Sequence, residues 1–486
     1  MNKNKKAVCL IVVLLMAVGC AMAVECSASQ PQVDRKTYES SYPTEEVLSE
    51  NEKIVDEKLS RMKEEAAALY SENTPFAIID WNEDTPIHEG LRNFCKDLPK
   101  GGDLHVHDEK FIPVDRYIKL LKEYGKVYIV LEEGDKYGFM YIGDAPENAV
   151  SLNEALEQGL LTEEELRENL VISDNDIPNG RWASFEKLFD KVMGINTDSE
   201  FLRRAYEEGF RSCCENNVFL VEIRAILFGN EEEIGKSIKL IRQAYYNVKK
   251  EYPELTVKVI GDSGKNDFFD KEFAVGILRS VINLSKTIKD DYDPDHIENF
   301  IIGLDLVNEE DSSKPLSEYE DFFTSDEVKN SGLKLFLHAG ESLRTDNDNV
   351  IDAYEFGSAR VGHGFNLYRF PELMEEYKKN NIELEVCPIS NYRLGYVSDL
   401  RNHPAVLYLH ENIPMVISSD DGLFLSRIPL TDDYYAAILS WDLDLAKIKE
   451  LTRNAIVYSD ISEYEQKLLL EKWEKDWNSF IEEYSK

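Results

Sequence analysis

The chain contains 486 residues, of which 43% are hydrophobic and 30% are charged, a composition typical of globular proteins. The formal net charge is −38, from 93 acidic and 55 basic side chains. Such an acidic surface repels polyphosphates, so nucleic acid is excluded as an expected partner. The length is that of two or three average domains, or of one large α/β barrel with additions.

Residues 1–23 are predicted to form a signal peptide. Three lysines precede a run of about a dozen apolar residues, which is shorter than a membrane-spanning helix requires. Two processing sites remain open: a lipoprotein signal that ends before Cys20 and attaches lipid to it, or ordinary cleavage after Ala21-Met22-Ala23. Both predict an exported protein, either secreted or anchored to a membrane and facing outside the cytoplasm.

Residues 24–98 are predicted to be an N-terminal polar segment followed by helices. Within this segment, residues 44–72 are rich in Glu, Lys, Leu and Ala, with apolar residues at helical spacing. The pattern predicts one or two amphipathic helices. Such helices pack either on their own domain or on a second copy of the chain. The sequence leaves both open, so a homodimer through these helices is one of two expectations.

Residues 99–486 are predicted to fold as a (β/α)₈ TIM barrel. Short, β-branched apolar runs alternate with helical stretches, which implies parallel strands joined by right-handed crossovers. In such a barrel the chemistry lies at the carboxyl ends of the strands. The predicted strands are residues 101–107, 218–225, 256–262, 300–307, 333–339, 359–364, 382–388 and 414–420.

The connection between the first two predicted strands is the longest. Within it, residues 127–143 predict a hairpin or small insertion, and residues 182–194 predict a helix. We expect this elaborated first βα connection to lie beside the active-site face. At the other end of the chain, residues 462–486 predict one terminal helix whose aromatic and leucine side chains pack on the core.

Two motif-like segments are predicted not to bind ligands. Residues 229–237 resemble a phosphate loop, but five residues separate the glycines where the motif has four, and three of the five are glutamates. Residues 346–357 resemble a calcium loop, but Ile351 stands at the glycine position and Gly357 at the position of the bidentate glutamate. We interpret the second segment as a loop and the start of a helix.

Four of the eight histidines lie at the ends of predicted strands. His105 and His107 are two apart on the first strand, so both face the barrel interior. His338 ends the fifth strand and Asp420 ends the eighth. Three imidazoles and one carboxylate would meet near the barrel mouth, a ligand set with room for a water that suits catalytic zinc. We therefore expect one Zn²⁺ per chain.

Three further residues adjoin these predicted ligands. Glu341 follows just past the fifth strand, where a carboxylate beside a metal-bound water can pass a proton to a substrate nitrogen. His363 ends the sixth strand between two glycines and is expected to be a second, non-ligand base. Asp421 follows the eighth strand and is expected to accept a hydrogen bond from a substrate N–H.

Six segments in this order resemble the adenosine deaminases: PKGGDLHVHD, LFLHAGE, ARVGHG, EVCPISN, DLRNHP and VISSDD. With WASFEKLF, VEIRA and the closing KWEKDWNSFI, they look most like the adenosine deaminase–related growth factors, the extracellular branch. The resemblance covers roughly residues 44–486. It implies a barrel of the metal-dependent amidohydrolase type and a purine nucleoside as the small-molecule substrate.

The resemblance also implies a role for each matching residue. Glu341 matches the glutamate that protonates purine N1, and His363 matches the histidine that orients and deprotonates the zinc water. Asp421 matches the aspartate that bonds purine N7. Asp108 resembles a ribose contact of the growth-factor branch, and Trp182 resembles a pocket tryptophan. The zinc ligands of the family are matched by His105, His107, His338 and Asp420.

The chain departs from the family around the predicted sugar and purine edges. Asn308 replaces a glycine whose backbone meets the purine; the backbone N–H is kept, but the added side chain is expected to crowd the pocket. Ser263 stands in the region of a histidine near the ribose. Residues 127–143 are much shorter than the receptor-binding insertion of animal members, so growth-factor signalling is not expected.

The sequence therefore predicts an exported zinc-dependent hydrolase that converts adenosine, and 2'-deoxyadenosine, to the inosine product and ammonia. Deamination is the firmer part of this prediction, and another adenine nucleoside or purine remains an alternative substrate. A catalytically silent nucleoside-binding surface protein is the alternative from a different class, against which the intact ligand set and Glu341 argue. A nucleotide such as AMP is less expected, because the acidic chain shows no basic cluster for a phosphate.

Overall fold

The computed structural model describes residues 42–70, 88–131, 138–143, 145–172, 181–266 and 268–486. The predicted signal peptide, with Cys20, lies outside the described residues. Each helix in the described part of the chain is too short or too polar to cross a lipid bilayer.

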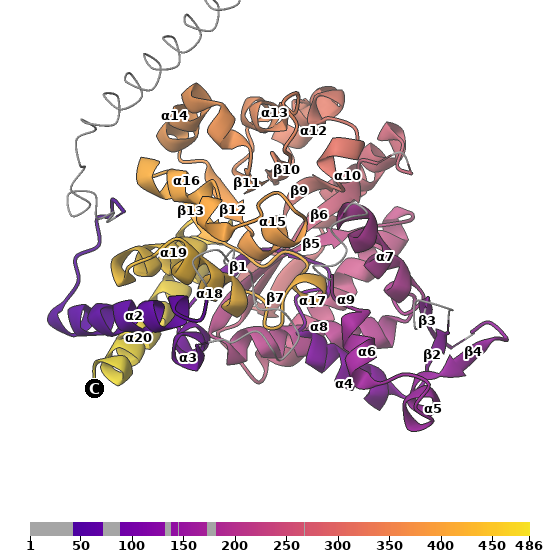
Figure 1. Ribbon diagram of the computed structural model, residues 1–486. Helices are drawn as coiled ribbons and strands as arrows, with labels where there is room; N and C mark the ends of the chain where they lie inside the picture. The colour runs from indigo at the N-terminus through magenta and orange to yellow at the C-terminus, as the bar shows by residue number, and fades with distance from the viewer. Residues whose placement is uncertain (1–41, 71–87, 132–137, 144, 173–180, 267) are drawn as a thin grey trace, which may run out of the picture. The chain divides into compact units, whose positions relative to one another are not determined.

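Eight parallel strands form one sheet that curves into a barrel (Figure 1). The first and last strands meet through a bridge between Val106 and Asp420, whose N–H donates to the carbonyl of His105 at 2.9 Å. The predicted (β/α)₈ barrel is confirmed, strand for strand. In hydrogen-bonded order the strands are β1 Gly101–His107, β5 Val218–Ile226, β6 Thr256–Gly264, β9 Ile301–Val307, β10 Lys334–Ala339, β11 Arg360–His363, β12 Glu383–Val386 and β13 Met415–Ile417.

Helices between consecutive strands surround the barrel (Figure 1). The phosphate-loop-like segment is the start of one of them: the Asn230 side chain caps the helix, and Glu233 completes a capping box. The calcium-loop-like segment likewise begins a helix, which ends at the left-handed Gly357. The longer outer helices are α8 Ser199–Glu215, α9 Glu231–Lys249, α10 Lys271–Ser285, α13 Asn349–Phe356, α14 Pro371–Asn380, α16 Ala405–Glu411 and α19 Leu445–Val457.

The connection between β1 and β5 contains a small antiparallel sheet. The predicted hairpin forms two of its strands, β2 and β3, and a third strand, β4, pairs with β2 on the other side. The predicted helix at residues 182–194 is α7. The elements are α4 Val114–Tyr124, β2 Val127–Val130, β3 Phe139–Ile142, β4 Ala149–Ser151, α5 Leu152–Glu157, α6 Glu163–Glu168 and α7 Arg181–Met193.

Shorter elements complete the loops at the two ends of the barrel. Residues 289–299 form a two-stranded antiparallel ribbon, and residues 431–440 form a buried helix. These elements are β7 Lys289–Asp293, β8 His296–Asn299, α11 Glu320–Phe323, α12 Asp326–Lys329, α15 Pro388–Arg393, α17 Gly422–Leu425 and α18 Thr431–Ser440.

The N-terminal extension packs on the barrel domain of its own chain. Its helices are α2 Glu50–Ala67 and α3 Glu89–Asp97, and α2 lies against the terminal helix α20 Glu463–Ser485 (Figure 1). The indole of Trp477 donates to the Glu52 carboxylate at 2.8 Å. Because this contact and the buried side chain of Leu59 occupy the inner face of α2, packing within the chain accounts for that face. A homodimer through these helices stays a prediction.

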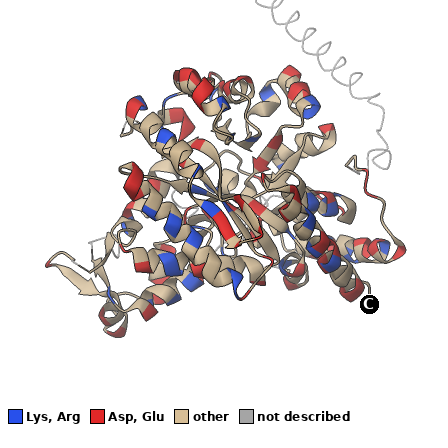
Figure 2. Cartoon of the chain, turned by 180° about the vertical axis from the view of Figure 1, so that it is seen from behind, with Lys and Arg blue, Asp and Glu red and all other residues tan. Residues whose placement is uncertain are grey.

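Acidic and basic residues are interspersed along the outer helices (Figure 2). Many form ion pairs one helical turn apart, such as Lys236 with Glu232 at 2.7 Å. Exposed pairs of this kind contribute little to stability. This distribution is that of a solvated surface carrying a large net negative charge.

Candidate active site

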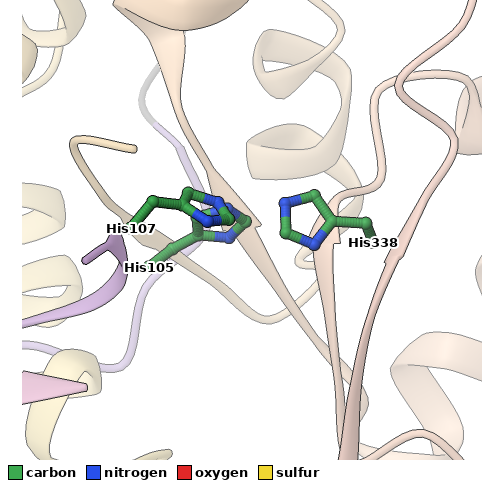
Figure 3. A group of neighbouring side chains, drawn as sticks. All are labelled: His105, His107 and His338. Carbon is green, nitrogen blue, oxygen red and sulfur yellow. The ribbon is translucent and has the colours of Figure 1, made fainter. Parts of the chain in front are cut away.

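The predicted metal ligands converge at the carboxyl ends of the strands. His105 and His107 come from β1, and His338 approaches them from β10, so that the three rings face one another (Figure 3). Their nearest ring nitrogens all lie within 4.8 Å of one another. The Oδ1 atom of Asp420, just beyond β13, lies 3.3 Å from His107 Nε2 and 3.8 Å from His105 Nε2. The structure thus brings the four predicted ligands together from three strands.

Two of these imidazoles are held from behind by carboxylates. His105 Nδ1 lies 2.9 Å from Glu385 Oε2, and His338 Nδ1 lies 2.7 Å from Asp305 Oδ2. A neutral imidazole that donates through Nδ1 leaves the lone pair of Nε2 free. The Nε2 atoms of His105 and His107 are only 3.3 Å apart. Lone-pair nitrogens that converge so closely, beside a carboxylate, fit a bound divalent cation.

The surroundings of the site favour the neutral form of its histidines, which is the form that binds metals. Burial is the largest influence on the pKa values of His105, His107, His338 and His363, and it lowers all four well below the usual range. The positive charge of Arg224 lowers them further. The lowered pKa values and the types of ligand atom therefore both indicate a metal site.

Arg224 connects the two carboxylates behind the ligands, a link that sequence reasoning missed. This buried guanidinium on β5 donates to Asp305 Oδ2 at 2.8 Å and also to Glu385 Oε2. It donates to the carbonyl of Leu104 at 2.9 Å as well. Each of these three charged residues interrupts an apolar strand sequence, which is the signal that could have identified them.

Replacing Arg224 with Met is expected to lower zinc affinity by about 10–100-fold, because partners behind metal ligands fix their orientation. It is also expected to destabilise the fold by about 3–5 kcal/mol, because Asp305 and Glu385 lose their shared cation. Zinc titration and thermal unfolding measure the two effects. Arg344→Met removes an exposed arginine paired with Asp346 and serves as the control. Unchanged zinc affinity in the Arg224 variant would contradict the role.

Glu341 reaches the site through a tight turn after β10. Gly340 has a φ of +82°, and a Cβ there would lie 2.6 Å from Asn366 Oδ1, so only glycine fits. The Glu341 Oε1 atom is buried without a hydrogen-bond partner and lies 3.6 Å from His363 Nδ1. Burial, followed by the charge of Asp420, raises the pKa of Glu341 well above its usual range. This carboxyl group is therefore suited to donate a proton near neutral pH.

A chain of hydrogen bonds sets the tautomer of His363. The Ala405 N–H donates to His403 Nδ1 at 3.0 Å, which places the ring proton of His403 on Nε2. That proton points to Asn391 Oδ1 at 3.0 Å, so the amide nitrogen of Asn391 faces His363 Nδ1 at 3.3 Å. Nδ1 of His363 is therefore the acceptor nitrogen. The segments CPISN and DLRNHP, which carry Asn391 and His403, thus support the site from behind.

Unfavourable backbone conformations concentrate at the site. Among the described residues, nine non-glycine residues have positive φ, and four of them follow or end a barrel strand at this mouth. Such conformations cost free energy and cluster where function requires a particular side-chain direction. These four residues are Asp108 (φ 41°), Asn308 (φ 105°), His363 (φ 62°) and Asp420 (φ 61°).

Two of the predicted substrate-binding residues, Asp421 and Trp182, differ in their hydrogen bonding. Asp421 is buried, and its Oδ1 atom has no hydrogen-bond partner, so it can accept from a ligand. Trp182, on α7, donates from Nε1 to the hydroxyl of Tyr396 at 2.6 Å. Burial, and then the charge of Glu341, raises the pKa of Tyr396.

The side chains of the other two predicted substrate-binding residues, Asp108 and Asn308, form hydrogen bonds within the protein. The Asp108 carboxylate accepts from the N–H of Ile226 at 3.2 Å. Asn308 Oδ1 accepts from the N–H groups of Lys265 and Asn266, at 3.0 and 3.4 Å. The Asn308 side chain is therefore directed at the loop after β6, whereas the sequence led us to expect it in the pocket.

Comparison with known proteins gives consistent matches. A model of the family described as adenosine deaminase matches residues 178–476, more than half of the chain. Adenosine deaminase 2-A of Danio rerio is 30% identical over 470 residues, covering 89% of this chain and 90% of the relative. Adenosine deaminase 2 of Homo sapiens is 27% identical over 471 residues, covering 90% and 88%. These longer matches include β1, which precedes the segment matched by the family model.

Solved structures share the fold at lower identity. An N6-mAMP deaminase of Arabidopsis is 17% identical and has a TM-score of 0.56, covering 79% of this chain and 99% of that chain. A cog1816 amidohydrolase of Burkhoderia ambifaria, determined with bound Zn, is 16% identical and has a TM-score of 0.60, covering 85% and 99%.

Proposed function

The chain belongs to the adenosine deaminase family, and from this premise we propose that it is a zinc-dependent hydrolase that converts adenosine and water to inosine and ammonia. We include 2'-deoxyadenosine as a second substrate. The observation that carries the proposal is the convergence of three imidazoles and Asp420 beside the buried carboxyl group of Glu341, whose Oε1 atom has no hydrogen-bond partner. A silent binding protein would not need both.

The ligand set proposed for the zinc ion is His105, His107, His338 and Asp420. A zinc ion held there would make a bound water acidic enough to react near neutral pH. This nitrogen-rich set suits zinc better than magnesium or calcium, which prefer oxygen ligands. The structurally similar amidohydrolase with bound Zn supports the choice of metal.

The side chains around this centre divide the proton transfers between them. His363 orients the attacking water and acts as the base that takes its proton. Glu341 gives its proton to purine N1, which makes carbon 6 electrophilic. Burial, and then the charge of Asp420, raises the pKa of Asp421, so that its carboxyl group can be protonated and donate a hydrogen bond to N7, which orients the ring with carbon 6 towards the metal centre.

We further propose that the protein acts outside the cytoplasm. Support comes from residues 1–23, whose lysines and apolar run are typical of a signal peptide. Secretion and lipid attachment at Cys20 remain the two forms of this proposal. Mass spectrometry of the mature N-terminus distinguishes them, since only the second leaves an acylated Cys20 at the first position.

The assay for the function is direct. Purified full-length protein loaded with Zn²⁺ and mixed with adenosine is expected to lower the absorbance of the adenine band and to release one ammonia per inosine. Adenine, AMP and N6-methyl-AMP are tested in parallel. Faster turnover of any of these than of adenosine would contradict the proposed substrate. Absence of ammonia from every compound would contradict the proposed reaction.

A further inference from the structure

Glu310 is a buried acidic residue in the loop that follows β9. It begins a short 3-10 helix, Glu310–Ser312, and is only 5% exposed. Burying a carboxylate is costly unless hydrogen-bond donors or a cation replace the water that it loses. Three N–H groups donate to Glu310. The groups that it holds are therefore the clue to its role.

All three donors come from the loop that follows β10. The backbone N–H of Glu341 donates to Glu310 Oε1 at 3.3 Å. The side-chain amides of Asn347 and Asn349 donate to Glu310 Oε2 at 2.7 and 3.0 Å. An ionised carboxylate accepts on both oxygens, whereas the amide of a glutamine has only one acceptor oxygen. A glutamate therefore satisfies both sides of this contact, and a glutamine cannot.

Neighbouring contacts hold the same turn on either side of Glu341. The hydroxyl of Ser342 donates to the carboxylate of Asp311. From the loop after β11, the N–H of Asn366 donates at 2.9 Å to the carbonyl of Gly340, the residue whose positive φ makes the turn. Because Oε1 of Glu341 has no hydrogen-bond partner, these contacts to the turn are the ones that locate the residue.

We propose that Glu310 is a positioning residue, whose carboxylate fixes the backbone of Glu341 so that the acid group lies within reach of purine N1. The inference rests on the proposed function. Proton transfer requires the donor and acceptor atoms to be within hydrogen-bond distance. A displacement of about 1 Å can slow a reaction by about 100-fold. In this role Glu310 acts through Glu341 and not by contact with the substrate.

Glu310→Gln is expected to lower kcat for adenosine by about 10–100-fold, while KM and zinc content stay as in the wild type. Glu309→Gln is the matched control. It alters the adjacent glutamate, which accepts from the hydroxyl of Ser312 at 2.6 Å, and it should leave kcat unchanged. Glu310→Asp keeps the charge but shortens the side chain, so it should be slow as well. Wild-type kcat in either Glu310 variant would overturn the proposal.

A double-mutant cycle separates this role from a general effect on the fold. In the Glu341→Gln background, which has no acidic proton to give, Glu310→Gln is expected to cause no further loss of kcat. A residue that only stabilises the loops would slow both backgrounds by the same factor, and that result would overturn the proposal. If Glu310→Gln does not fold, Asn347→Ala removes one donor from Glu310 Oε2. It is expected to lower kcat by a smaller factor with the same non-additivity.

Amide hydrogen exchange tests the contact without turnover, so it distinguishes this proposal from the proposed function. Full-length protein loaded with Zn²⁺ is exchanged and digested, and the peptides that cover residues 340–349 are followed. Faster exchange in Glu310→Gln, but not in Glu309→Gln, supports the contact even if adenosine is not deaminated, and the proposed function then fails alone. Equal exchange in the wild type and Glu310→Gln would overturn the contact, and with it the positioning role.

Discussion

Replacement of Glu341 by Gln is expected to lower kcat/KM for adenosine by about 10²–10⁴-fold while one zinc ion per chain is retained. The substitution preserves the shape of the side chain but removes the acidic proton that purine N1 requires. Burial raises the pKa of the Glu341 carboxyl group, which favours the protonated form that the reaction needs. Steady-state kinetics and metal analysis of the same preparation measure the two quantities.

The control for this variant is Glu355→Gln, which changes an exposed glutamate on the outer helix α13. It is expected to match the wild type in both measurements. Two results would count against the role of Glu341. Full activity of the variant would mean that another group protonates the substrate. Loss of zinc would mean that Glu341 supports the metal centre, and the kinetic effect would then need a different explanation.

The barrel could be predicted because the sequence patterns that indicate its strands and helices are local. Each strand is a short β-branched run bounded by helical sequence, and parallel pairing follows from that alternation. The convergence of His105, His107 and His338 could then be deduced, because all strand ends of a parallel barrel meet at one mouth. The strand β4, Ala149–Ser151, was missed, because three residues are too few to show a period.

The residues behind the site could not be predicted from local pattern. Arg224, Asp305 and Glu385 lie in different strands, and only the closed barrel brings them together. The direction of Asn308 depends on a φ of 105°, which sequence does not reveal. A family comparison made this side chain an obstacle in the pocket, whereas the structure makes it the support of Lys265.

Removing the metal by chelation is expected to abolish deamination, and adding back one equivalent of Zn²⁺ is expected to restore it. His107→Ala is expected to prevent this recovery, because the loss of one imidazole leaves three of the four proposed ligands. A measurement independent of turnover is thermal unfolding. Zinc should raise the Tm of the wild type, since an ion that binds only the folded chain stabilises it by RT ln(1 + [L]/Kd).

The matched control for the ligand variant is His296→Ala, which removes an exposed histidine stacked on Tyr464. This variant should respond to zinc as the wild type does, which excludes a general effect of losing a histidine. If His107→Ala showed the wild-type rise in Tm with zinc, the ion would bind elsewhere. Activity that survives chelation in the wild type would contradict the metal dependence itself, because Glu341 and His363 alone cannot make water nucleophilic enough at neutral pH.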